Sequence, residues 1–153
     1  MAFSLPCGSC ALCGNYGGHT KSMVPSVNSF TAESKRVSLS APLNCSDYGI
    51  YVAVCKNCRA AYVGKTRESF SSRWNQHRMD WNHCECSRRS NCPALKHHYH
   101  EHHPIIFRRK PDLAECYSVY FVEQPAPRRI DCRERDWIND IGSSINIQRP
   151  SRC

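Results

Sequence analysis

The sequence predicts a small mixed domain of the α/β (α+β) class, in which a three-stranded antiparallel sheet is flanked by helices. Three observations support this prediction. The apolar stretch 49–64, interrupted once by polar residues, is typical of a β-hairpin. Beyond it, apolar residues recur every three or four positions, as in a helix with one buried face. The run 115–122 has high β propensity and is followed by a second helical pattern.

Two tyrosines lie on adjacent strands of the predicted hairpin. Apolar residues occupy alternate positions from Ile50 to Val54, and the apolar run resumes at 60–63. Tyr51 therefore belongs to the first strand and Tyr62 to the second.

The helix after the hairpin carries an apolar stripe. The stripe consists of Phe70, Trp74, His77 and Trp81. Because Arg73 and His77 are four residues apart, they share a face next to that stripe.

The remaining elements follow from β propensity and from proline positions. We expect the run 115–122 to be the central strand of the sheet. Pro125 breaks the chain after it, and apolar residues at helical spacing then predict a helix over 128–141. Pro93 is suited to the first turn of a histidine-rich helix over 93–102.

A chain of 153 residues fits one domain with a modest core. The stretch 15–40 is rich in Gly, Ser, Thr and Asn, which favours a linker or an irregular strand. We expect a cysteine-bearing leader and linker at 1–42, a folded domain at 43–149 and a tail at 150–153.

The net charge of +8 and the pI near 9.0 favour a polyanionic partner. The first residues lack the charged and apolar regions of an export signal, and no segment approaches the roughly 20 apolar residues of a membrane span. We therefore expect an intracellular, nuclear protein without a membrane partner.

Twelve cysteines require an explanation, and without an export signal their short spacings suit metal or reduced thiols better than disulfides. Cys7, Cys10 and Cys13 are spaced so that their sulfurs can converge on one ion. Tetrahedral zinc needs a fourth ligand, for which His19 and Cys45 are the candidates. The alternative is a leader with unpaired thiols.

A second cysteine pair, Cys55 and Cys58, lies at the turn of the predicted hairpin. A C-x-x-C turn presents two thiolates to one ion, and the helix over 93–102 could supply histidine ligands.

A third group of cysteines precedes that helix. Cys84, Cys86 and Cys92 could bind an ion with His83, form a disulfide or be free. We favour free or weakly metal-binding thiols.

Two triplets, Gly49-Ile50-Tyr51 and Tyr62-Val63-Gly64, mark the hairpin, and Arg73, His77, Glu134 and Asn146 follow them in order. This pattern resembles the GIY-YIG nuclease family, a small α/β domain found in homing endonucleases, excision-repair nucleases, some restriction enzymes and Penelope-like retroelements. The resemblance covers about 43–149 and implies a GIY-YIG-like fold with a zinc-knuckle elaboration.

Within that family, the chain is similar to the Penelope-like branch. There, a cysteine-bearing segment precedes the domain, two cysteines lie between the triplets and two histidines follow. On this pattern, the residues that hold a structural Zn²⁺ are Cys55, Cys58, His97 and His103. His98, His100 and His102 compete for the histidine positions.

The resemblance also implies roles for the hydroxyls and the nearby cation. Tyr51 is the general base that activates water, and Tyr62 orients that water by a hydrogen bond. Because an unperturbed tyrosine has a pKa of about 10, Tyr51 needs help from positive charge such as Lys65 or from a metal-bound water.

The same resemblance assigns the phosphate and metal contacts. Arg73 contacts the scissile phosphate, and His77 touches that phosphate or assists a proton transfer. Glu134 holds one Mg²⁺, since a lone carboxylate with waters and phosphate oxygens suits that ion. Asn146 matches the family's asparagine, although it follows Ser144-Ile145 rather than Gly-Leu.

The function that follows is a metal-dependent DNA endonuclease of retroelement origin, which cuts or nicks DNA. A rival is a zinc-stabilised module that binds nucleic acid or protein without catalysis. A third interpretation, an extracellular disulfide-rich domain, is opposed by the missing export signal. The first of these requires two phenols, a guanidinium and a carboxylate to meet around one phosphate-sized pocket.

Overall fold

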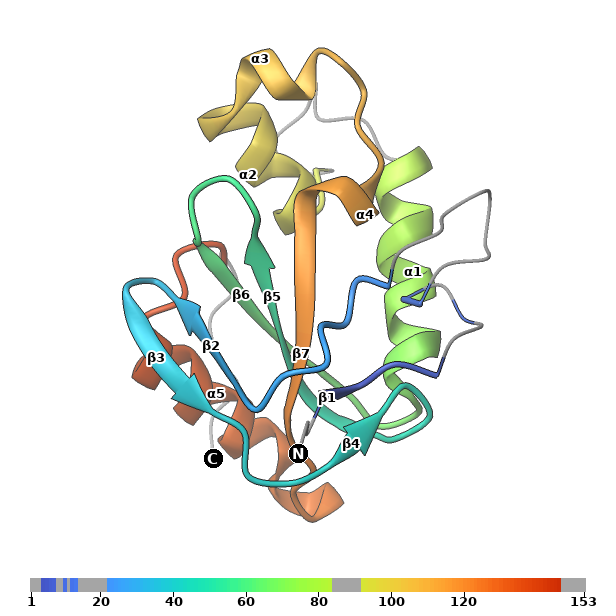
Figure 1. Ribbon diagram of the computed structural model, residues 1–153, viewed down its shortest axis with the longest axis vertical. Helices are drawn as coiled ribbons and strands as arrows, with labels where there is room; N and C mark the ends of the chain where they lie inside the picture. Colours follow the sequence, from blue (N-terminus) through green and yellow to red (C-terminus); the bar gives the residue numbers. More distant parts are fainter. Residues whose placement is uncertain (1–3, 8–9, 11, 14–21, 84–91, 147–153) are drawn as a thin grey trace.

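The computed structural model describes residues 4–7, 10, 12–13, 22–83 and 92–146 (Figure 1). The strands are β1 (Ser4–Leu5), β2 (Ser29–Ala32), β3 (Lys35–Ser38), β4 (Leu43–Asn44), β5 (Gly49–Cys55), β6 (Ala61–Thr66) and β7 (Tyr117–Glu123). The helices are α1 (Phe70–His83), α2 (Ala94–His102), α3 (Pro104–Phe107), α4 (Leu113–Cys116), the 3-10 helix η2 (Pro127–Arg129) and α5 (Ile130–Ile141).

The main sheet has the strand order β6-β5-β7, and both pairings are antiparallel. This confirms the predicted fold class, a small antiparallel sheet with helices around it. The predicted place of the third strand is wrong, because β5 is central and β7 lies at an edge. The sequence of β7 is apolar because the strand is buried on both faces. An edge strand that other elements cover has the same pattern as a central strand, so the pattern alone does not distinguish them.

The two faces of the sheet have different covers, as Figure 1 shows. Side chains alternate along β5, so Tyr51 and Ala53 join one core and Ile50 and Val52 join the other. The first core includes residues of α1 and α2, and the second includes residues of α5 and of β2 and β3. The helices α1 and α5 therefore lie on opposite faces.

The stretch expected to be a linker or an irregular strand contains an antiparallel hairpin, β2–β3. Its turn places Glu33 and Ser34 at positive φ. The hairpin is held to the main sheet by Phe30, whose ring stacks on Tyr120 with a centroid separation of 4.0 Å. Phe30 and Val37 face the core at paired positions.

The predicted stripe forms the buried face of α1, whose buried residues are Phe70, Trp74, His77 and Trp81. The other helices begin within a few residues of the prediction, at Ala94 and Ile130. In the described part of the chain, every helix is too short or too polar to span a lipid bilayer.

Candidate active site

The Tyr51 ring crosses the neighbouring strand at Gly64. These two residues are directly opposite in the β5–β6 pairing. A Cβ atom at Gly64 would lie 2.3 Å from both the Cζ and the hydroxyl oxygen of Tyr51, so the strand can accept only glycine beneath this ring. The missing side chain lets the ring extend over β6 and carry its hydroxyl toward the outer edge of the sheet.

The Tyr51 hydroxyl is bonded to a buried histidine. Its oxygen lies 2.5 Å from Nε2 of His77. Burial and then the charge of Arg73 lower the pKa of His77 to about 3, so the ring is neutral near pH 7. Burial raises the pKa of Tyr51 well above its usual range, which favours a protonated hydroxyl that donates to the neutral imidazole.

Arg73 connects the two tyrosines. Burial raises the pKa of Tyr51 and of Tyr62, whereas the charge and hydrogen bonding of the Arg73 guanidinium lower both. The Tyr51 and Tyr62 ring centroids are 6.5 Å apart. The Arg73 guanidinium thus favours the phenolate form of both residues, and the Lys65 charge also favours that of Tyr62.

Two carboxylates reach the same edge from α5. The Lys65 Nζ lies 2.5 Å from Asp131 Oδ1 and 3.4 Å from Glu134 Oε1. Burial raises the pKa of Glu134, Lys65 lowers it, and Asp131 raises it again. The Glu134 charge in turn raises the pKa of both Tyr51 and Tyr62, so this carboxylate lies within electrostatic reach of the phenols.

The edge strand β6 explains how residues from opposite faces meet. Tyr62 pairs with Ala53 and therefore points to the α1 face, whereas Lys65 pairs with Ile50 and points to the α5 face. Because β6 ends the sheet, side chains from both faces can turn around it. Six of the expected residues gather here: Tyr51, Tyr62, Lys65, Arg73, His77 and Glu134.

The Asn146 side chain hydrogen-bonds to the backbone of the edge strand β6. Its Nδ2 donates to the Val63 carbonyl at 2.9 Å, and its Oδ1 accepts from the Val63 amide at 2.8 Å and from Ser143 Oγ. The side chain therefore holds the backbone between Tyr62 and Gly64. The sequence predicts Asn146 in the catalytic set, and in the structure both ends of its amide hydrogen-bond to the backbone of Val63 in β6.

The leader cysteines converge with Cys45. The sulfur atoms of Cys7, Cys10, Cys13 and Cys45 all lie within 4.8 Å of one another, and those of Cys13 and Cys45 are 3.3 Å apart. Of the two candidate fourth ligands, Cys45 completes this set, and His19 lies outside the described residues. Four thiolates at this spacing could hold a metal such as zinc.

A second set joins the hairpin turn to α2. It consists of Cys55, Cys58, His98 and His103. The Cys58 sulfur lies 3.2 Å from Nε2 of His98, and the Cys55 sulfur lies 3.6 Å from Nε2 of His103. Ligands about 2.0–2.3 Å from a tetrahedral zinc are separated by roughly these distances.

The structure places His98, rather than the expected His97, in this possible ligand set. The helix α2 buries Leu95, His98 and Tyr99, which share a face at three- and four-residue steps. His97 is rotated away from that face, and its Nε2 lies 3.9 Å from a Glu101 carboxylate oxygen. Helical geometry, rather than the spacing to the next histidine, selects the ligand.

The sequence patterns missed the positions of Asp131 and Glu33, and for Cys92 the structure selects one of the alternatives that they left open. Asp131 lies three residues before Glu134 on α5 and shares its face, a helical spacing that could have identified it. Glu33 accepts from the Ala61 amide at 2.9 Å and from Ser144, and no sequence signal marks this long-range contact. Cys92 belongs to a disulfide rather than being free, whereas Cys84 and Cys86 lie outside the described residues.

The protein is thus a mixed α/β domain with a cluster of tyrosine, arginine, histidine and glutamate side chains at one edge of its three-stranded sheet. A family model described as the GIY-YIG catalytic domain matches residues 47–148. Since the match covers more than half of the chain, the chain belongs to the GIY-YIG family, a family of endonucleases, and its domain implies a nucleic acid substrate. No curated protein and no solved structure matches the chain.

Proposed function

We propose that the protein is a metal-dependent DNA endonuclease that nicks or cleaves phosphodiester bonds. The observation that carries the proposal is that Arg73 hydrogen-bonds Tyr51 and that Glu134 lies 3.4 Å from Lys65 of the edge strand β6, although Tyr51, Arg73 and Glu134 come from three elements on two faces of the sheet. Such convergence serves no packing purpose for a guanidinium and a carboxylate, which are costly to bury.

The buried histidine supplies the help that a tyrosine base requires. As an attacking water donates its proton to the Tyr51 oxygen, the Tyr51 proton can pass to Nε2 of His77, 2.5 Å away. Because burial and the charge of Arg73 lower the pKa of His77 to about 3, this transfer requires a bound phosphate whose negative charge offsets that of Arg73. The nucleophile is then generated without a free phenolate in the ground state. We assign His77 the proton-transfer role, since it is only 8% exposed and offers little surface to a phosphate.

Arg73 and Tyr62 complete the phosphate contacts. The guanidinium is half-buried and faces both phenols, so it can bind phosphate oxygens while it lowers the pKa of Tyr51. Tyr62 is more exposed than Tyr51 and is placed to orient the water.

The carboxylates fit a hard divalent cation. Glu134 is 15% exposed, and the Lys65 amine next to it is 25% exposed. An oxygen ligand of this kind, with waters and phosphate oxygens, suits Mg²⁺. When bound, Mg²⁺ supplies Lewis-acid stabilisation of the phosphate and of the leaving oxygen. Asp131 lies beside the same amine and could hold a metal-bound water.

The two sulfur-containing sets are proposed to hold structural Zn²⁺. Their donors are thiolates and imidazoles, which favour zinc over magnesium. The Tyr99 hydroxyl lies 3.2 Å from the Cys55 sulfur and can orient that ligand.

The retroelement origin and nuclear location also belong to the proposal. The C-x-x-C turn between the triplets, with histidines downstream, supports the similarity to the Penelope-like branch. The positions of Cys55, Cys58, His98 and His103 are compatible with this similarity if His98, rather than His97, is taken as the third ligand.

A binding module without catalysis is the second candidate. It is favoured by one observation: the Tyr51 side chain is only 2% exposed, and its hydroxyl is already bonded to His77. A water molecule that reacts at Tyr51 must therefore replace the hydrogen bond to His77 or bind to the same hydroxyl beside it.

Nicking of supercoiled plasmid separates the two functions. We expect Mg²⁺-dependent nicking by the zinc-loaded protein, and its loss in Glu134→Ala and Tyr51→Phe, because the metal ligand and the base are removed. His97→Ala is a matched control that should nick normally. Activity in Glu134→Ala equal to that of the unmodified protein, or no activity in either with DNA binding intact, would favour the binding module.

A further inference from the structure

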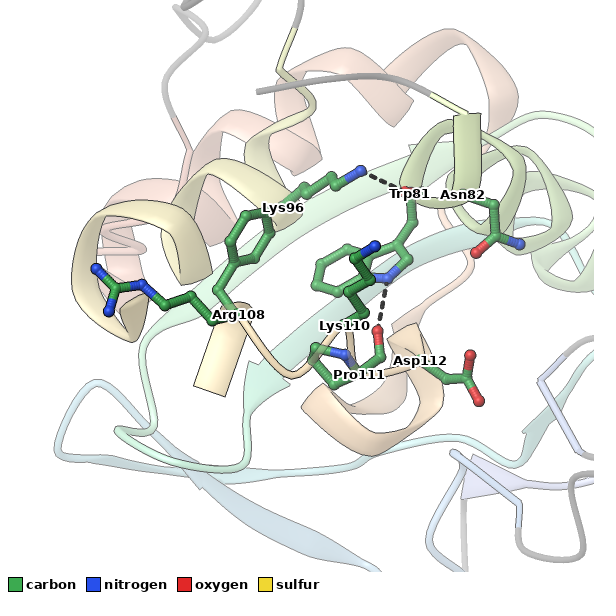
Figure 2. A pocket seen from close by; sticks show the side chains of 8 residues that line it. Trp81, Asn82, Lys96, Arg108, Lys110, Pro111 and Asp112 are labelled. Atoms are coloured by element: carbon green, nitrogen blue, oxygen red, sulfur yellow. Dashed lines mark hydrogen bonds between the residues drawn. The ribbon is translucent and has the colours of Figure 1, made fainter. Parts of the chain in front are cut away.

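A pocket of about 420 Å³ lies at the C-terminal end of α1 (Figure 2). This volume falls within the roughly 300–1,000 Å³ that is typical of ligand sites. The pocket is formed by α1, α2, α3 and the segment that leads to α4. None of the proposed catalytic or zinc-binding residues lines it.

Its apolar surface is aromatic and held in place. Trp81 is buried, and its Nε1 donates to the Pro111 carbonyl at 3.1 Å. The Lys96 amine donates to the Trp81 carbonyl at 2.7 Å, which ties α2 to α1. Phe107 adds a half-buried ring from α3. A flat ligand would therefore meet preformed aromatic surface.

Its polar surface is mainly cationic. Lys96, Arg108 and Lys110 line the pocket together with one carboxylate, that of Asp112. In Figure 2, Lys96 points toward Trp81, whereas Arg108 and Asp112 point away from the ring at opposite ends. The excess of positive charge favours an anionic ligand. The Arg108 guanidinium points outward and could bind a negatively charged group at the mouth of the pocket.

Aromatic surface inside and cations around it match the two parts of a nucleotide. A base stacks on aromatic rings regardless of its identity, and a phosphate is bound by arginine and lysine. A purely apolar ligand would make no use of the Arg108 and Lys110 charges, and inorganic phosphate would make no use of the rings.

The pocket also lies along the helix that carries Arg73. Trp81 follows Arg73 by eight residues on α1, which corresponds to about 12 Å along the helix axis. A strand whose phosphate contacts Arg73 can cover this distance with a few nucleotides.

We propose that this pocket binds one unpaired nucleotide of the DNA strand that is cut, a few nucleotides from the scissile phosphate. The proposal rests on the proposed nuclease function and adds to it a preference for DNA with a single-stranded segment beside the cleavage site.

The test uses fluorescence anisotropy with zinc-loaded Glu134→Ala protein and a labelled short oligodeoxythymidine strand. Arg108→Gln should weaken binding about three- to fivefold and reduce the slope of log K against log salt by about 0.7, the value for one lost phosphate contact on a single strand. Phe107→Leu keeps an apolar side chain but removes the ring, so it should weaken binding at least about fivefold without changing that slope.

Arg109→Gln is the matched control. Arg109 is exposed, adjacent in sequence and outside the pocket, so this variant should bind the strand as the parent protein does. If Arg109→Gln has the same effect as Arg108→Gln, binding is a general property of the basic surface and the pocket proposal fails. It also fails if thymidine monophosphate competes with the strand at equal concentration, because the site would then bind a free nucleotide.

The plasmid assay separates this failure from that of the nuclease. Nicking by the unmodified protein with unaltered strand binding in Arg108→Gln and Phe107→Leu would overturn only the pocket. Loss of strand binding in both variants, with no nicking by the unmodified protein, would support the pocket and overturn the proposed hydrolysis.

Discussion

At the scale of single residues, the glycine of the second triplet has a steric role. In Gly64→Ala, the new methyl group would overlap the Tyr51 ring, so the ring must move away from the edge of β6. We expect a loss of roughly 1–3 kcal/mol in the free energy of unfolding, as is usual for overpacking, and a large loss of nicking.

Chemical denaturation and the plasmid assay measure these two effects. Tyr51→Phe is the comparison, since it should lose nicking while it keeps the ring and most of the stability. A Gly64→Ala protein with normal activity would show that the crossing of the ring over β6 is unimportant.

The neutral state of His77 gives a pH dependence with a definite sign. The folded protein keeps the pKa of this residue near 3, whereas an unfolded histidine has a pKa of about 6.5. Below pH 6.5 the unfolded chain binds a proton that the folded chain does not, so stability falls as the pH falls toward 3. From pH 7 to pH 5 this amounts to about 2 kcal/mol.

The measurement is the free energy of unfolding of the parent protein and of His77→Asn at both pH values. The parent should lose about 2 kcal/mol more than the variant, because the other titrating groups are common to both proteins. Equal losses would mean that folding leaves the pKa of His77 near its usual value, which would contradict the buried neutral ring described here.

The proposed catalytic residues could be predicted because their order along the chain resembles the GIY-YIG pattern. Tyr51, Arg73 and Glu134 were found from that order, and the structure brings them together. Asp131 was missed because an acidic residue on an exposed helix face is common. Its pairing with Lys65 depends on the packing of α5 against β6, which no local pattern encodes.

At the scale of elements, the loop that follows α5 fastens the edge strand. Asn146 makes two hydrogen bonds with the backbone of Val63, and Glu33 from the β2–β3 turn bonds to the amides of Ala61 and Ser144. The residues on either side of Val63 are those that the cluster uses, so this loop positions Tyr62 and Gly64.

Asn146→Ala should therefore behave as a change in positioning. We expect a loss of about 1–3 kcal/mol of stability, because two buried backbone groups lose their partners. Nicking should decrease without a change in the Mg²⁺ concentration needed for half-maximal activity. Glu134→Asp alters the proposed metal ligand and serves as the comparison. If Asn146→Ala shifts the Mg²⁺ concentration for half-maximal nicking as much as Glu134→Asp does, Asn146 lies at the metal instead.

Hairpins and helices were predicted where their periodicity is strong, as in the stripe of α1. The β2–β3 hairpin was not recognised because its strands have only four residues each and lie in a polar stretch. Its apolar residues, such as Phe30 and Val37, become informative only when strand pairing places them on one face.

At the scale of the whole molecule, the two candidate zinc-ligand sets bring parts of the chain that are distant in sequence next to the elements that carry the candidate active site. The Cys45 carbonyl accepts from the Ser71 amide at 2.9 Å, so the first set adjoins the start of the helix that carries Arg73. The second set lies at the turn between β5 and β6, and joins that turn to α2.

Metal analysis of the purified protein tests both sets. We expect two zinc ions per chain, and about one in either Cys45→Ser or His98→Ala, since each variant removes one ligand from one set. His97→Ala is matched to His98→Ala by its adjacent place on α2 and should retain both ions. Zinc loss in His97→Ala but not in His98→Ala would mean that His97 is the ligand, as the sequence predicts.

Zinc removal should also act on catalysis through stability. Binding of zinc to such sites contributes on the order of 10 kcal/mol to folding, so a chelator should unfold the domain or lower its melting temperature strongly. Of the two single-site variants, Cys45→Ser should reduce nicking more, because its set adjoins the first turn of α1, the helix that carries both Arg73 and His77. Thermal unfolding followed at 280 nm, with nicking measured below the transition, separates lost folding from displaced catalytic residues. Full activity of a folded Cys45→Ser protein would show that the leader cysteines act independently of the α1 position.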